Sequence, residues 1–139
     1  MDRLNTRNIL RRKIFNIQDN NYNCILCNSN MEETTFHLFF SCQFSVRVWN
    51  YLDIHWDHGL DFFSMMQQAK ADRQLSFFME VFIVAAWHIW KQKNSWIFES
   101  RQPNFEAWKE GFHEEMSLQT YRFRQILKVA VTSWLQNLA

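Results

Sequence analysis

The sequence predicts an all-α fold, a compact helical domain with a stapled loop near the N-terminus and a long C-terminal helix. Its 139 residues include only two glycines and one proline, which leaves little material for the tight turns that join β-strands. Hydrophobic residues make up 47% of the chain, enough to bury a core at this length and to argue against disorder. Apolar residues also recur at helical spacing through most of the second half.

The helix signals follow one another along the chain. Thr6 is suited to cap a short basic helix, and Thr34 or Thr35 a second one, because threonine side chains accept hydrogen bonds from the first backbone amides of a helix. Pro103 suits the first turn of the last helix. The predicted helices cover residues 6–15, about 35–52, 62–69, about 73–100, and from 103 onward.

All three cysteines of the chain lie in one short stretch together with a histidine, in the pattern C-x2-C-x9-H-x4-C. The four residues are Cys24, Cys27, His37 and Cys42. Two pairs of such ligands separated by a loop can close around one zinc ion, and three thiolates with one imidazole leave no open coordination position. We therefore predict a structural Zn²⁺ that staples the loop. The alternatives are buried apolar cysteines or a disulfide framework, which the odd number of thiols disfavours.

Positions five apart do not share a face of an α-helix, so His37 is expected in or just before the first turn, with Cys42 reaching back toward the metal. We expect a single domain over residues 1–139, in which residues 1–56 form the zinc-binding part and residues 60–139 an aromatic-rich helical part.

The helix predicted over residues 73–100 is apolar nearly all round in its middle, which is typical of the centre of a domain. We interpret one stripe on it as core packing, and His88 as a buried core histidine. The apolar run is too short for a membrane span, which needs about 20 residues. The stripe consists of Ile83, Trp87, Trp90, Asn94 and Ile97.

The last predicted helix repeats apolar residues with steps of three, four and four. Unbroken, about 35 residues would extend about 52 Å, which is longer than a domain of this size is wide. Either Gly111 or the stretch 117–120 interrupts it, or its end overhangs and pairs with a second copy of the chain. The candidate homodimer interface consists of Phe123, Leu127, Trp134 and Leu138.

The N-terminus is more basic than the rest of the chain. Fifteen basic and 14 acidic residues give a formal net charge of +1, which is not typical of a strong nucleic-acid binder. A basic stripe near the start could contact phosphate groups, or could be a solvated helix face; it also resembles a mitochondrial import signal. The stripe consists of Arg3, Arg7, Arg11, Arg12 and Lys13.

No group of residues indicates catalysis. Gly59 and Gly111 are too far apart to form a phosphate-binding loop, and no nucleophile accompanies His55 and His58, which we interpret as loop histidines. His113 is expected at the surface. The sequence therefore predicts a protein without enzymatic activity.

Four segments together resemble one known family. The segments RLNTRNILRRK (3–13), CILC (24–27) and HLFFSCQFSVRVWNYL (37–52) are similar to the zinc-binding domain that follows the reverse transcriptase in plant LINE-type retrotransposons. The segment AAWHIWKQKNSWIF (85–98) is similar to the tryptophan-rich segment that follows this domain in those polyproteins. The resemblance implies zinc ligands at the four positions named above. Lys93 stands where the family pattern leads one to expect Arg, and the last 35 or so residues resemble nothing we can name.

Two hypotheses about function follow. The first is a zinc-stabilised module that binds a protein partner of unknown identity and interferes with it. A second copy of the chain, forming a homodimer, is one such partner. The alternative is an RNA-binding module that uses the basic N-terminus, and it is second because the chain is nearly neutral. The expected location is intracellular, in the cytoplasm or nucleus, with the mitochondrion as the alternative.

Overall fold

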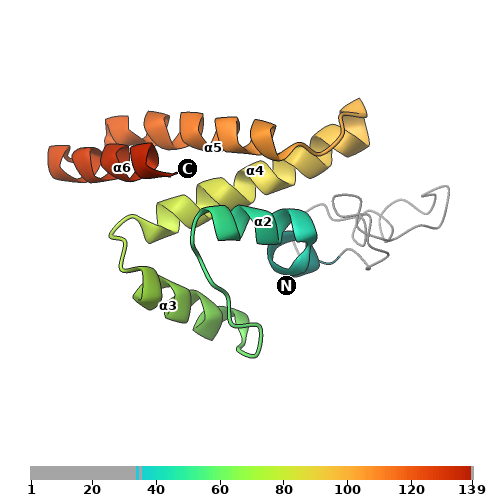
Figure 1. Ribbon diagram of the computed structural model, residues 1–139, viewed down its shortest axis with the longest axis horizontal. Helices are drawn as coiled ribbons and strands as arrows, with labels where there is room; N and C mark the ends of the chain where they lie inside the picture. The colour runs from blue at the N-terminus through green and yellow to red at the C-terminus, as the bar shows by residue number, and fades with distance from the viewer. Residues whose placement is uncertain (1–33, 35, 139) are drawn as a thin grey trace. The chain divides into compact units, whose positions relative to one another are not determined.

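The computed structural model describes residue 34 and residues 36–138, and all regular structure in this part of the chain is helical (Figure 1). The predicted helical class is therefore confirmed for these residues, and the helix predicted over residues 6–15 lies outside them. The elements are η1 (His37–Ser41), α2 (Gln43–Tyr51), α3 (Phe62–Arg73), α4 (Phe78–Glu99), α5 (Phe105–Gln119), η2 (Thr120–Arg122) and α6 (Gln125–Asn137).

The chain divides into two compact units. Unit 1 comprises Met1–Arg47 and Ile89–Pro103, and unit 2 comprises Val48–His88 and Asn104–Ala139. Helices α2 and α4 contribute residues to both units, whereas α3, α5 and α6 belong to unit 2 alone. The expected subdivision of one domain near residues 56–60 stays a prediction.

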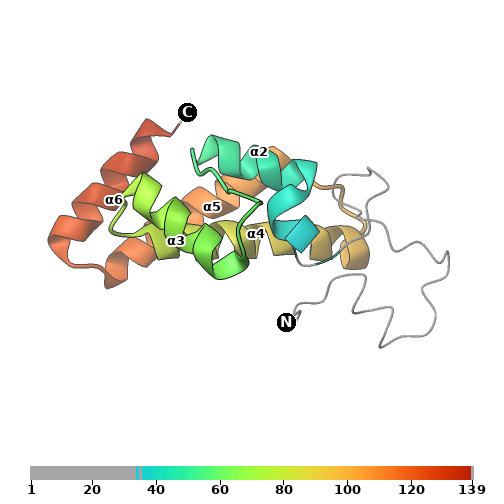
Figure 2. The same ribbon diagram turned by 90° about the horizontal axis from the view of Figure 1, so that it is seen from below.

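The helix predicted from about Thr35 to Leu52 is in fact two elements. Residues His37–Ser41 form a π-helical turn, Cys42 adopts an extended ψ of 139°, and α2 begins at Gln43. Figures 1 and 2 both show the chain changing direction between this turn and α2. The predicted cap at Thr34 is confirmed, because its Oγ1 accepts a hydrogen bond from the backbone amide of His37 at 3.0 Å.

The boundary between α3 and α4 also differs from the prediction. Asp61 caps α3 by accepting a hydrogen bond from the amide of Ser64 at 2.7 Å, and the helix continues to Arg73. Gln74 then takes the left-handed backbone conformation, with φ 52°. A residue in that conformation ends a helix, and α4 consequently starts only at Phe78 rather than near Arg73.

The predicted long C-terminal helix is wrong, because the chain reverses direction between α5 and α6 (Figure 1). The break follows the stretch 117–120, one of the two positions considered for it. Thr120 donates its hydroxyl to the carbonyl of Ser117 at 2.6 Å, a local bond that competes with continued helix. Pro103 lies outside α5, whose cap is Asn104; its Oδ1 accepts from the amide of Glu106 at 2.8 Å.

The core of unit 2 is built around one face of α5. Trp108, Phe112 and Met116 are each fully buried and stand four residues apart, so they lie on one side of the helix. The rings of Trp108 and Phe112 stack with their centroids 5.1 Å apart. The indole N–H of Trp108 also donates to the carbonyl of Ala85 at 3.1 Å, which ties α5 to α4.

The predicted core stripe on α4 is wrong for its first two members. Ile83 is 58% exposed and Trp87 45% exposed, while the other three members are half-buried. The first half of the helix instead buries Phe78, Val81, Val84, Ala85 and His88. Because the helix is apolar nearly all round, periodicity could not select its buried face. None of the helices described here is long and apolar enough to cross a membrane.

Gly111 occupies a position on α5 where α4 comes close. A Cβ atom there would lie 2.6 Å from Nδ1 and 2.9 Å from Cε1 of the buried His88 ring. Replacing Gly111 with alanine adds helix propensity worth about 1 kcal/mol, but overpacking costs about 1–3 kcal/mol. We expect a net destabilisation of about 1 kcal/mol, measured by thermal unfolding. Glu114→Ala, on the exposed side of α5, should leave stability nearly unchanged. A more stable Gly111→Ala variant would contradict this packing.

Candidate metal centre

Two of the four predicted zinc ligands, His37 and Cys42, lie in the described part of the chain, at the two ends of the π-helical turn. The amide of Cys42 donates to the carbonyl of His37 at 2.7 Å, an i to i+5 bond. Such a turn holds more residues than the 3.6 of an α-helix. Positions five apart therefore come nearer to one face than α-helical winding allows. His37 stands in the first turn, as predicted. Cys42 comes near the face of His37 because the turn between them winds as a π-helix and not as an α-helix.

Both side chains are withdrawn from solvent. His37 is 6% exposed and Cys42 is fully buried, and the Nδ1 atom of His37 lies beneath the surface. The rings of Phe36 and Phe40 pair with centroids 5.3 Å apart, and Ser45 donates its hydroxyl to the carbonyl of Leu38. The bond from Ser45 ties the turn to the start of α2.

The chemistry of these donors fits zinc, which binds imidazole nitrogen and thiolate sulfur. Cys24 and Cys27 lie outside the described residues and stay predictions. Among residue 34 and residues 36–138, no three histidine, cysteine or carboxylate side chains gather to hold a metal ion. A four-ligand centre at His37 and Cys42 therefore needs donors from the remaining part of the chain, which is where the other two cysteines are.

The other predicted sites lie partly inside and partly outside the described residues. The basic stripe from Arg3 to Lys13 lies outside the described residues. The four residues of the candidate dimer interface are half-buried, and the ring of Trp134 already packs against Phe77 and Phe112 within unit 2, at 5.4 and 6.2 Å. His55 lies in an exposed loop, as predicted, with its Nε2 3.2 Å from a carboxylate oxygen of Asp53.

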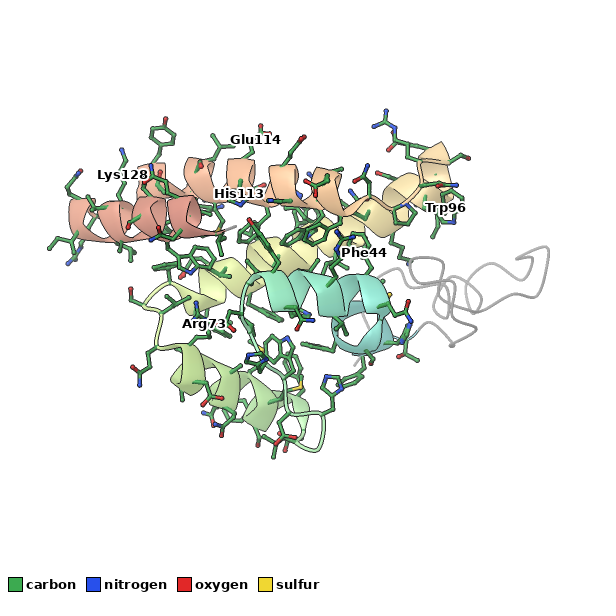
Figure 3. The ribbon with its side chains drawn as sticks, viewed as in Figure 1. Phe44, Arg73, Trp96, His113, Glu114 and Lys128 are labelled. Atoms are coloured by element: carbon green, nitrogen blue, oxygen red, sulfur yellow. The ribbon has the colours of Figure 1, made fainter. Side chains whose placement is uncertain are left out.

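Sequence analysis missed the environment of His113, which was expected at the surface. Its Nε2 lies 2.6 Å from the hydroxyl of Tyr51, and its centroid is 5.9 Å from that of Phe112. Figure 3 shows the side chains of His113 and Glu114 on opposite sides of the α5 ribbon. Burial, and then the nearby charge of Lys109, lower the pKa of His113, and burial followed by the charge of Glu106 raises the pKa of Tyr51.

The lowered pKa of His113 predicts how stability depends on pH. The unfolded chain binds this proton more readily than the folded one, so the contribution of His113 to stability is complete above its ordinary pKa of 6.5 and is lost as the pH falls through the lower folded value. Protonation also leaves Nε2 unable to accept the proton of Tyr51. Melting temperatures at pH 8 and pH 5 should differ less for His113→Gln than for the wild type. An equal difference for both proteins would contradict the assignment.

Sequence analysis also missed the burial of Lys93. This residue of α4 is 0% exposed, whereas Lys91 on the same helix is exposed. The only available signal was its place in a helix that is otherwise strongly apolar in the middle. Lys93 belongs to unit 1, as do His37 and Cys42.

Comparison with protein families places the zinc-ligand pattern within a matched range. Residues 1–49 match the family model described as zinc-binding in reverse transcriptase. The matched range contains all four predicted ligands. No curated protein and no solved structure matches the chain.

Proposed function

We propose that the chain is a non-catalytic interaction module of retroelement origin, from a plant LINE-type element. The proposal is supported by the match of residues 1–49 to the family model described as zinc-binding in reverse transcriptase. Cys24, Cys27, His37 and Cys42 would hold one structural zinc ion. Bound zinc would supply folding energy to the loop between the two ligand pairs. The working surface of the module is formed by side chains of its helices.

The observation that carries this proposal is a row of exposed apolar side chains on α4. Met79 is 38% exposed, Ile83 58% and Trp87 45%. They stand four residues apart and therefore line one face over three successive turns. A contiguous apolar patch on a soluble protein is typical of a protein-binding site, and a partially exposed tryptophan is the residue type most enriched among binding hot spots.

The charge of the chain supports a protein partner over a nucleic acid. A formal net charge of +1 provides little of the electrostatic attraction on which phosphate binding depends. We infer that the module binds a partner of the parental polyprotein through this row of side chains and competes with the polyprotein for it. Interference with that partner is the activity we propose for the module.

The test introduces negative charge into the exposed apolar row on α4. Ile83→Glu with Trp87→Glu should leave the zinc content and helical circular dichroism unchanged, because both side chains are exposed, and should weaken binding to the partner more than tenfold. The matched control is Ile126→Glu with Val129→Glu, which alters two exposed apolar residues of α6 (86% and 57% exposed).

The partner is identified by quantitative comparison of proteins that co-purify with the wild type and with each double variant, and affinity is then measured with the purified pair. Sedimentation of the chain alone tests whether the partner is a second copy. Unchanged affinity in the α4 variant would overturn the proposal.

The alternative function is RNA binding through the basic stripe, and a titration distinguishes it from the proposed function. If the proposed function is right, the zinc-loaded protein should bind single-stranded RNA no more tightly than about micromolar near physiological salt. Tight binding with a salt slope of several phosphates, removed by Arg7→Glu with Arg11→Glu, would favour the RNA-binding module instead.

A further inference from the structure

Unit 2 exposes apolar side chains at the start of α3, and the charged groups beside them are acidic. Phe63 is 68% exposed and Phe62 57%, and residues 57–63 contain two aspartates and no lysine or arginine. The amide of Ser64 donates to Asp61 and lowers the pKa of that carboxyl, which is therefore ionised at neutral pH. We call this surface the acidic patch; it consists of Asp57, Leu60, Asp61, Phe62 and Phe63.

Another exposed apolar surface lies where the chain reverses between α5 and α6 (Figure 1), and the charged groups beside it are basic. Tyr121 is 78% exposed and Ile126 86%, and Nζ of Lys128 lies 5.2 Å from the centroid of the Tyr121 ring. Residues 116–138 contain three basic residues and no carboxylate side chain. We call this surface the basic patch; it consists of Tyr121, Arg122, Arg124, Ile126, Lys128 and Val129.

The two patches are opposite in charge, and each exposes large apolar side chains. Opposite charges align two surfaces as they meet, and exposed apolar side chains supply the area that is buried between them. Both patches belong to unit 2 and both are exposed in the same chain, so they do not cover each other within one molecule. Each copy of the chain therefore offers a surface that is complementary to a different surface of the next copy.

Charge also selects how two copies meet. In a twofold-symmetric dimer a patch meets its own equivalent, and here groups of like charge would face each other, which costs free energy. We propose that the acidic patch of one copy binds the basic patch of a second copy, in a head-to-tail contact. Such a contact leaves one patch of each kind unused, so the assembly extends or closes into a ring. The inference goes beyond the proposed function, because neither patch includes a predicted zinc ligand or the exposed row on α4.

The test uses two double variants of the full, zinc-loaded chain. Asp57→Asn with Phe63→Lys alters the acidic patch. The asparagine keeps an oxygen that accepts from the amide of Gly59, which lies 2.9 Å from Oδ1 of Asp57, so the turn before α3 should persist. Arg124→Glu with Ile126→Glu alters the basic patch. Negative charge is favourable at the start of a helix, so α6 should also persist, and circular dichroism checks both variants.

Sedimentation velocity over a range of protein concentrations measures the association. The wild type should grow beyond a dimer as its concentration rises, and salt should weaken the association because it screens exposed charges. Each variant alone should associate more weakly than the wild type by about tenfold or more. An equimolar mixture of the two variants should form a 1:1 complex and nothing larger, because each variant retains the patch that the other has lost.

The matched control is Ile83→Glu with Trp87→Glu on α4, which should associate as the wild type does. Association that is lost in this control and kept in both patch variants would locate the contact on α4 and overturn the proposal. A mixture of the patch variants that stays monomeric would also overturn it, as would a wild type that is monomeric at its highest soluble concentration. Co-sedimentation of such a monomer with vesicles of acidic lipid would assign the basic patch to a membrane surface instead.

Discussion

Replacing Cys42 with serine is expected to abolish stoichiometric zinc binding and the folding that depends on it. The side chain is fully buried at the end of the π-helical turn, and a serine hydroxyl does not ionise near neutral pH to replace a thiolate ligand. Structural zinc sites supply about 10–16 kcal/mol of apparent binding energy at pH 7. Metal analysis of the purified protein should therefore give one zinc per chain for the wild type and nearly none for the variant.

The loss of helical circular dichroism should be partial. Helices α3, α5 and α6 lie in unit 2, which has its own aromatic core around Trp108 and Phe112. Chelator treatment of the wild type should reproduce the spectrum of Cys42→Ser. His55→Gln is the control, because His55 lies in an exposed loop, and this variant should keep its zinc. A Cys42→Ser protein that retains one zinc ion and the wild-type melting curve would refute the predicted ligand set.

The helical class could be predicted because it depends on composition, but the ends of the helices depend on local conformations that composition does not specify. Gln74 ends α3 in the left-handed conformation, a state in which glycine or asparagine is more usual than glutamine. The reversal after Thr120 was foreseen only as one of three alternatives. Nothing in the apolar repeat indicated it, because the spacing of three, four and four continues across the break.

The reversal also changed which residues of the last helix are buried. The apolar repeat includes Trp134, which is half-buried, whereas Val131 and Leu135, which stand outside the repeat, are buried. The 3₁₀ turn at residues 120–122 and the new start at Gln125 shift the inward positions by one residue. A period read along a sequence keeps its phase only while the helix is unbroken.

The candidate metal centre could likewise be predicted from the sequence only in part. Ligand types and spacing predicted the zinc chemistry, and residues 1–49 match a zinc-binding family. The π-helical turn between His37 and Cys42 could not be predicted, because no propensity distinguishes it from an α-helical turn. The burial of Lys93 was hidden because long basic side chains usually extend to solvent.

Replacing Trp108 with alanine is expected to destabilise unit 2 by about 3–5 kcal/mol, the usual cost of truncating a fully buried tryptophan. The indole is 0% exposed, stacks on Phe112 and donates to the carbonyl of Ala85, so the change removes packing and a link between α5 and α4 together. Urea unfolding followed by circular dichroism measures the loss. Trp108→Phe keeps an aromatic ring and should lose less, and Trp87→Ala, at a 45% exposed position, should lose little. Equal losses for Trp108→Ala and Trp87→Ala would contradict a core centred on α5, because the two changes delete the same side chain from a buried and from an exposed position.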